Sequence, residues 1–252
     1  MIEKIKFISV NNYNNWHIQV LYDTYQTKSL KHILEHMLIK FEIIFGRHIM
    51  ESEDCDVYIE SNSECPMLIT STPRLLIRLS VESATYWSQV IYQLSHELCH
   101  YTLRQTSCGN ESLKWVEETL CEAMSMYILE YFYETWDDFV LSRDYPNYRE
   151  HIKNYLMGIY EEEYGIGLAD CKNKNQLIQL NIVSERDRQE RVRERNIVYN
   201  IFKSKPEKIR LIDQYQSYRD DIIIDFNKWK DKSNEIFIEE LSQIQPILDN
   251  IF

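Results

Sequence analysis

The amino-acid sequence predicts an α+β protein, with a small mixed sheet and helices in a first lobe and a mainly helical second lobe. Glycine and proline number only 5 each among 252 residues, which excludes collagen-like, linker-rich and low-complexity chains. Strand-favouring stretches lie within residues 5–79, and apolar residues recur at helical spacing over 29–45 and again from residue 84 onward. We therefore expect an amino-terminal lobe over residues 1–135 and a helical carboxy-terminal lobe over residues 136–252, packed on the first.

Five short stretches have the length and composition of β-strands. They are Ile5–Val10, Trp16–Tyr22, Asp56–Glu60, Met67–Thr70 and Leu75–Leu79. The last stretch follows Pro73, which cannot donate a hydrogen bond to a central ladder. We therefore expect an edge strand made of Leu75, Leu76, Ile77, Arg78 and Leu79.

Three helices are predicted by apolar residues that recur every three or four positions. The first covers Ser29–Phe45 and is followed by Gly46, a residue typical of helix ends. The second covers roughly Ala84–Leu103 and the third roughly Leu113–Tyr133. The faces expected to point inward consist of Trp87, Val90, Ile91, Leu94, Leu98 and Tyr101 on the second helix, and Val116, Leu120, Ala123, Met124, Tyr127, Ile128 and Tyr131 on the third.

Charge and cysteine usage narrow the function classes. The formal net charge is −12, so a general nucleic-acid partner is not expected. No apolar run is long enough to cross a bilayer, and residues 1–10 alternate charged with apolar groups instead of forming the continuous apolar segment of a signal peptide. The 6 cysteines show no C-x-x-C spacing, which favours free thiols in a reducing compartment. We expect a cytoplasmic protein that does not bind membranes.

One motif carries recognisable chemistry. His96-Glu97-Leu98-Cys99-His100 reads H-E-x-x-H and lies in the second predicted helix. Residues four apart share a helix face, so the imidazoles of His96 and His100 can point at one metal ion. Glu97 would lie beside them as the general base that takes a proton from a water molecule at the metal. The pattern therefore predicts a zinc site.

A catalytic zinc ion needs a third protein ligand and an open fourth position. The third predicted helix offers two carboxylates four residues apart, Glu118 and Glu122, within an apolar sequence where unpaired carboxylates are costly. We assign Glu118 as the third ligand and Glu122 as the acceptor of the free ring N–H of His96, which would fix its tautomer. Glu117 is the rival ligand, because it lies about 100° away around the helix. Solvated or salt-bridged glutamates are the alternative interpretation.

The two segments together resemble the gluzincin family of zinc metallopeptidases. Ser95-His96-Glu97-Leu98-Cys99-His100 is followed by Trp115-Val116-Glu117-Glu118-Thr119-Leu120-Cys121-Glu122-Ala123, and the family carries H-E-x-x-H before a helix with W-x-x-E or E-x-x-x-D/E. The resemblance, over about residues 65–130, implies a zincin-like lobe, zinc ligands at His96, His100 and Glu118, and Glu97 as base. It also implies that an extended peptide or protein substrate would lie along Leu75–Leu79.

The resemblance leaves the oxyanion-stabilising residue open. Gluzincins use a tyrosine or histidine downstream, and no local motif here identifies one. Tyr127, His151, Tyr155 and Tyr160 are the candidates. A non-catalytic binding or regulatory protein on a zincin scaffold is therefore the alternative to a metallopeptidase, and a processing protease dedicated to one protein partner is a third hypothesis.

Two other segments are interpreted as surface. His32-Ile33-Leu34-Glu35-His36 spells the inverted H-x-x-E-H motif, but Lys28 and Lys40 extend its histidines into a cationic stripe that would repel a metal ion. We interpret this stripe as solvated. The segment Ser184–Arg195 carries five arginines against four acidic residues at mostly complementary spacing, which is typical of a self-paired, solvent-exposed helix.

Overall fold

The structure, a computed structural model, describes residues 5–107, 112–162, 167–184, 191–246 and 248. Within these ranges the chain has the expected α+β composition, with one small mixed sheet and many helices. Among the described helices, none combines the length and the apolar character that crossing a membrane requires.

Contacts between Cα atoms divide the chain into two compact units, each built from two segments. Unit 1 comprises Met1–Thr102 and Ile128–Leu156, and unit 2 comprises Leu103–Tyr127 and Met157–Phe252. This division differs from the expected boundary after residue 135. The chain leaves unit 1 within helix α3 (Trp87–Thr106) and re-enters it within helix α4 (Lys114–Thr135), so one point in the sequence does not separate the units.

Unit 1 contains a five-stranded sheet in the order β1-β2-β3-β5-β4. Strands β2, β3 and β5 are parallel neighbours, whereas β1 and β4 pair antiparallel at the two sides. Their bounds are β1 Phe7–Val10, β2 Tyr13–Gln19, β3 Cys55–Ile59, β4 Met67–Ile69 and β5 Leu75–Leu79. The expected small mixed sheet is thus present.

The expectation that Leu75–Leu79 forms an edge strand is wrong. Strand β5 pairs with β3 on one side and with β4 on the other, and β4 lies at the edge of the described sheet. Pro73 precedes the strand by two residues and therefore removes no donor from its ladder. The alternation of buried Leu75, Ile77 and Leu79 with half-buried residues shows that one face of the strand lies on the core.

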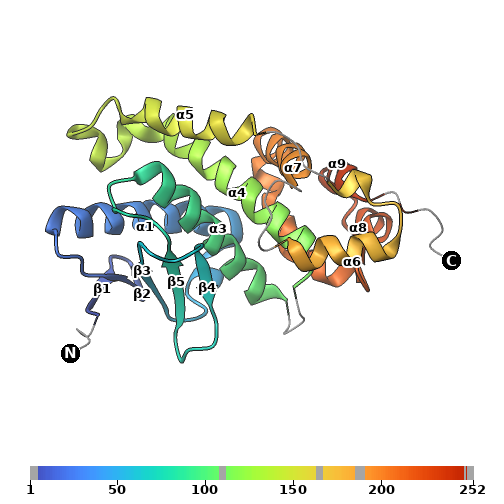
Figure 1. Cartoon of the computed structure of the whole chain (residues 1–252), viewed down its shortest axis with the longest axis horizontal. Helices are drawn as coiled ribbons and strands as arrows, with labels where there is room; N and C mark the ends of the chain where they lie inside the picture. Colours follow the sequence, from blue (N-terminus) through green and yellow to red (C-terminus); the bar gives the residue numbers. More distant parts are fainter. Residues whose placement is uncertain (1–4, 108–111, 163–166, 185–190, 247, 249–252) are drawn as a thin grey trace. The chain divides into compact units, whose positions relative to one another are not determined.

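Helices α1 (Thr24–Phe45) and α3 lie along one side of the sheet (Figure 1). The ring of Tyr101 on α3 contacts the fully buried Trp16 of β2, with centroids 4.8 Å apart. The Gln93 side chain on α3 exchanges two hydrogen bonds with the backbone of Ser80, just after β5. These contacts fix the H-E-x-x-H helix to the sheet.

The predicted inward faces of α3 and α4 are confirmed, with one exception. All six apolar residues named for α3 are buried, as are the first six named for α4. Tyr131 is half-buried. Burial extends beyond these faces, since every residue of α3 from 90 to 99 and of α4 from 115 to 129 is buried, so both helices are enclosed on all sides over these stretches.

Unit 1 also includes α2 (Arg47–Met50), the 3-10 turns η1 (Trp136–Asp138) and η2 (Val140–Arg143), and the start of α5 (Tyr148–Tyr160). An aromatic cluster joins η1 and the start of α5 to α3: Trp87 contacts Trp136, Tyr145 and Tyr148 at centroid distances of 4.5 to 5.8 Å. Large aromatic rings therefore supply much of the core at this end of the unit.

The cationic stripe on α1 is not a fully solvated surface. The His36 ring stacks on Tyr131 of α4 at a centroid distance of 5.2 Å, and the Lys40 ammonium lies 4.5 Å from the centre of the same ring. His32 lies nearer the surface, 3.5 Å from Glu35. The interpretation of the stripe as solvated is therefore wrong for His36 and Lys40, whose side chains pack on an aromatic residue distant in sequence.

Unit 2 is mainly helical, as expected for most of the carboxy-terminal half. Its elements are η3 (Leu168–Asp170), α6 (Lys174–Val183), α7 (Val192–Ser204), η5 (Pro206–Tyr218), β6 (Arg219–Asp220), β7 (Ile223–Ile224), α8 (Phe226–Ser233), α9 (Ile236–Leu241) and η6 (Ser242–Ile244). The first half of α4 also belongs to this unit, and its Trp115 indole donates to the carbonyl of Ile222. The first half of α4, which carries Glu117, Glu118 and Glu122, therefore packs in the same unit as the carboxy-terminal helices.

Candidate metal centre

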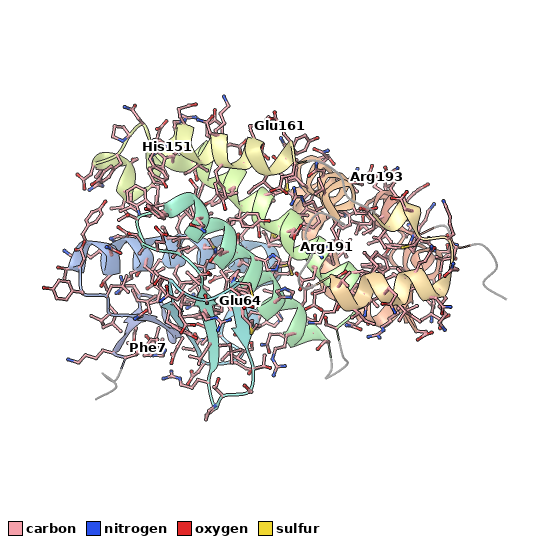
Figure 2. The ribbon with its side chains drawn as sticks, viewed as in Figure 1. Phe7, Glu64, His151, Glu161, Arg191 and Arg193 are labelled. Carbon is pink, nitrogen blue, oxygen red and sulfur yellow. The ribbon has the colours of Figure 1, made fainter. Side chains whose placement is uncertain are left out.

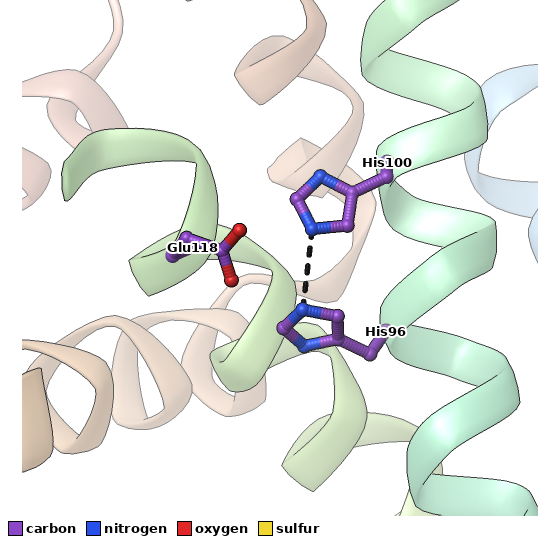
Figure 3. A group of neighbouring side chains, drawn as sticks. All are labelled: His96, His100 and Glu118. Atoms are coloured by element: carbon purple, nitrogen blue, oxygen red, sulfur yellow. Dashed lines mark hydrogen bonds between the residues drawn. The ribbon is translucent and has the colours of Figure 1, made fainter. Parts of the chain in front are cut away.

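Helix α3 places two imidazoles on one of its faces. His96 and His100 are one turn apart, and their Nε2 atoms lie 3.2 Å from each other (Figure 3). His96 is buried and His100 half-buried. The apolar neighbours Leu94 and Leu98 are fully buried and anchor the helix here, and the buried Ser95 hydroxyl is satisfied by donating to the carbonyl of Ile91 in the same helix.

Glu118 of α4 completes a group of potential ligands with these imidazoles. One atom from each of His96, His100 and Glu118 lies within 4.8 Å of the others, and Figure 3 shows the carboxylate directed towards the two rings. Glu118 is buried. Among the described residues, these three form the one cluster of histidine, cysteine or carboxylate side chains whose spacing can hold a metal ion.

The donor set fits a divalent transition metal. Two imidazole nitrogens and one carboxylate leave a further coordination position for solvent or substrate, as catalytic zinc sites require. Two nitrogens bound to zinc at about 2.0–2.1 Å with a tetrahedral angle would lie about 3.3 Å apart, close to the observed 3.2 Å. The identity of the metal does not follow from these donors, because other first-row metals accept them too.

The rival ligand Glu117 is engaged elsewhere. The hydroxyl of Tyr215, from η5, donates a short hydrogen bond to the Glu117 carboxylate, and Gln216 donates to the Tyr215 oxygen. Burial, and next the adjacent Glu117 charge, raise the pKa of Tyr215 well above its usual value, so this hydroxyl keeps its proton. The group around the imidazoles accordingly contains Glu118 and not Glu117.

The carboxylate of Glu122 contacts two arginines. Its Oε1 lies 2.8 Å from Nη2 of Arg191, and its Oε2 lies 3.5 Å from Nη1 of Arg195. Glu122 is fully buried, so this pairing accounts for a charge that would otherwise be too costly in the interior. Its assignment as the acceptor for the His96 ring stays a prediction.

The interpretation of Ser184–Arg195 as a solvent-exposed helix is wrong where the structure describes it. Residues 185–190 lie outside the described residues, but Arg191 and Arg195 are each only 1% exposed. Arg193, two residues on, is exposed, and in the view of Figure 2 its label lies nearer the outline of the molecule than that of the buried Arg191. The sequence signal that could have found them is their i, i+4 spacing, which matches that of Glu118 and Glu122.

Glu97, the predicted base, lies next to His96 on α3 and is 3% exposed. The backbone thus places it near the imidazoles but, as neighbouring helix residues must, about 100° around the axis from His96. Its role as general base stays a prediction.

The oxyanion candidates remain predictions. The described ring contacts of Tyr127, Tyr155, Tyr160 and His151 are with other aromatic residues, namely Phe202, Tyr92, Tyr199 and Tyr148. Tyr215 is a further tyrosine near this group, and its hydroxyl reaches the carboxylate of Glu117, next to Glu118. It lies 98 residues from Glu117 along the chain, and no local spacing indicates such a contact.

Comparisons with known proteins gave no match: no family model, no curated protein and no solved structure resembles this chain closely enough to report.

Proposed function

We propose that this protein is a zinc-dependent hydrolase that cleaves peptide bonds. The observation that carries the proposal is the group of His96, His100 and Glu118, whose ligand atoms lie within 4.8 Å of one another. Its two histidines belong to an H-E-x-x-H helix, so the donors come together with a carboxylate suited to proton transfer.

The chain's own residues have distinct roles in this proposal. A bound zinc ion would supply Lewis acidity that makes a water molecule nucleophilic near neutral pH. Glu97 accepts the proton of that water as its oxygen attacks the substrate carbonyl, and then donates the proton to the leaving amine. One water is thus added across the C–N bond, which breaks to give a carboxylate and an amine. The buried position of Glu97 keeps bulk water away from this transfer.

The edge of the sheet offers a binding mode for an extended substrate. In the described sheet β4 pairs only with β5. An extended peptide can therefore add as a further strand along the other side of β4, by hydrogen bonds to its backbone. We therefore transfer the proposed substrate strand from Leu75–Leu79 to Met67–Ile69. Met67 is 44% exposed, so a substrate side chain can reach it.

Glu97→Gln is the substitution that tests the proposed chemistry. We expect the purified variant to retain the zinc content of the wild-type protein, because residue 97 is not among the three ligands. Turnover of a mixture of unstructured peptides should fall by about 10²–10⁴-fold, because the amide cannot accept the proton. Metal content by mass spectrometry and peptide cleavage by chromatography are the measurements.

Glu134→Gln is the matched control, because Glu134 is an exposed carboxylate near the end of α4. It should leave both metal content and turnover unchanged. A Glu97→Gln protein with full activity would refute the assigned role of Glu97. A wild-type protein that binds zinc with every coordination position filled by protein, and cleaves no peptide, would instead support a binding or regulatory protein.

A further inference from the structure

The guanidinium of Arg191 lies between the two carboxylates that α4 presents one turn apart. Its Nη2 atom is 2.8 Å from Oε1 of Glu122 and 4.0 Å from Oε2 of Glu118. All three side chains are less than 10% exposed. Arg191 also donates to the backbone carbonyl of Ser184, so its planar group is held by contacts on more than one side.

We propose that Arg191 is a positioning residue for the metal ligand Glu118. It holds the Glu118 carboxylate in place before any metal arrives, so that the site is formed in the metal-free protein. This inference rests on the metal-binding part of the proposed function, and it does not depend on whether the protein hydrolyses peptides.

The need for such a residue follows from the charges on α4. Glu118 and Glu122 are like charges on the same face of one helix, and both are buried, so each repels the other in a region where water screens little. A cation shared by both carboxylates removes this conflict. Arginine suits the task better than lysine, because its planar fork can contact two carboxylates in a fixed geometry.

Arg191 contacts the two carboxylates at unequal distances. The short contact at 2.8 Å commits Arg191 to Glu122, whereas 4.0 Å from Glu118 is an ion pair without a hydrogen bond. Arg191 therefore acts on the Glu118 carboxylate through its charge and not through a hydrogen bond. Residues that orient a ligand in this way commonly change metal affinity by 10–100-fold when replaced.

Arg195 provides a matched comparison within the same cluster. It is as deeply buried as Arg191 and also pairs with Glu122, at 3.5 Å. Its other described partners are the carbonyl of Ile159 and the carboxylate of Glu162. Replacing Arg195 therefore disturbs the same buried charge cluster without removing the contact to Glu118.

The experiment compares R191M and R195M with the wild-type protein, using Zn²⁺ or Co²⁺ alone as the probe. Metal dissociation constants are measured by competition with a chelator, the coordination geometry by the visible absorption of bound Co²⁺, and stability by urea unfolding of the metal-free protein. We expect R191M to bind Zn²⁺ about 10–100-fold more weakly, with a changed Co²⁺ spectrum. R195M should unfold at lower urea but keep its Zn²⁺ affinity within about threefold and its Co²⁺ spectrum unchanged.

A third variant, R191M combined with E122Q, removes both members of the 2.8 Å pair and keeps the proposal testable if R191M fails to fold. Recovered stability with Zn²⁺ binding weaker than that of E122Q alone supports the positioning role, because the buried charges are balanced while the contact between Arg191 and Glu118 is lost. Wild-type affinity and a wild-type Co²⁺ spectrum in any folded variant lacking Arg191 would overturn it. Absence of metal binding in the wild-type protein would overturn both proposals, whereas metal binding without peptide cleavage counts against the hydrolase alone.

Discussion

His36 shows how packing changes the behaviour of a single ionisable side chain. Besides stacking on Tyr131, its ring lies 5.0 Å from the rings of both Phe132 and Phe139. Burial, and next the positive charge of Lys40, lower the pKa of His36 below its ordinary value. The protonated form is therefore less stable in the folded protein than in the unfolded chain.

This lowered pKa predicts a loss of stability in mild acid. Because the unfolded chain binds a proton at His36 near pH 6.5 and the folded protein only at lower pH, stability is fully present above about pH 6.5 and decreases as the pH falls below it. His36→Gln should remove up to about 1 kcal/mol of the difference in unfolding free energy between pH 7.5 and pH 5.5. Urea unfolding at the two pH values measures this difference.

His32→Gln, one turn earlier on α1, is the control for losing an imidazole from this helix. If it reduces the pH dependence as much as His36→Gln does, the assignment to His36 is wrong.

Residue spacing was sufficient to predict part of the candidate site. His96 and His100 share a face because they are four apart on one helix, and that relation needs no information from the rest of the chain. Spacing alone did not decide between Glu118 and Glu117 as the third ligand, because both belong to the same turn of α4. In the structure Glu117 accepts a hydrogen bond from Tyr215, which belongs to a distant segment, and Glu118 lies in the group with the imidazoles.

At the scale of elements, the end of α1 depends on one glycine. Gly46 follows the last helical residue with φ +95° and ψ 148°, and its amide donates to the carbonyl of Glu42. A side chain at this backbone geometry is strained, and an added Cβ would lie 3.0 Å from the His48 ring. The glycine predicted as a stop signal thus has a conformational reason to be there.

Gly46→Ala should therefore lower the unfolding free energy by about 1–3 kcal/mol. Gly158→Ala is the matched control, because Gly158 lies within α5 and an added Cβ meets no atom within 4 Å. Alanine there should raise the unfolding free energy by about 0.5–1 kcal/mol, since alanine is the better helix former. Equal effects of the two substitutions in urea unfolding would contradict this account.

The order of strands shows where element-level reasoning failed. Each strand of the five-stranded sheet was located within three residues from its composition, but the partners of a strand are decided by segments elsewhere in the chain. Strand β4 has only three residues, Met67–Ile69, yet it covers the side of β5 that was expected to be free. A proline two residues before a strand does not indicate whether that strand lies at an edge, because this depends on which other segments pair with it.

At the scale of the whole molecule, metal binding should be linked to folding. The three candidate ligands come from two helices, and their atoms are gathered within 4.8 Å only in the folded chain. Free Zn²⁺ at about 100 times its dissociation constant should therefore add about 2.7 kcal/mol to the unfolding free energy. Removing the metal with a chelator should reverse this gain, as measured by thermal or urea unfolding.

His100→Ala should abolish the stabilisation by Zn²⁺, whereas His48→Ala, which removes an exposed histidine, should preserve it. A similar gain in both variants would place the bound metal elsewhere on the protein.

The sequence by itself determined the α+β class, the small mixed sheet, the two long helices with their buried faces, and the pairing of His96 with His100. These features follow from local periodicity, because side chains on one helix face or one strand face are fixed by spacing alone. Only the tertiary structure decided that Leu75–Leu79 is an inner strand, that Glu118 faces the imidazoles, and that Arg191 and Arg195 are buried against Glu122. Arg191 and Glu122 are 69 residues apart, and a buried charge finds its partner through packing, which no local pattern of residues records.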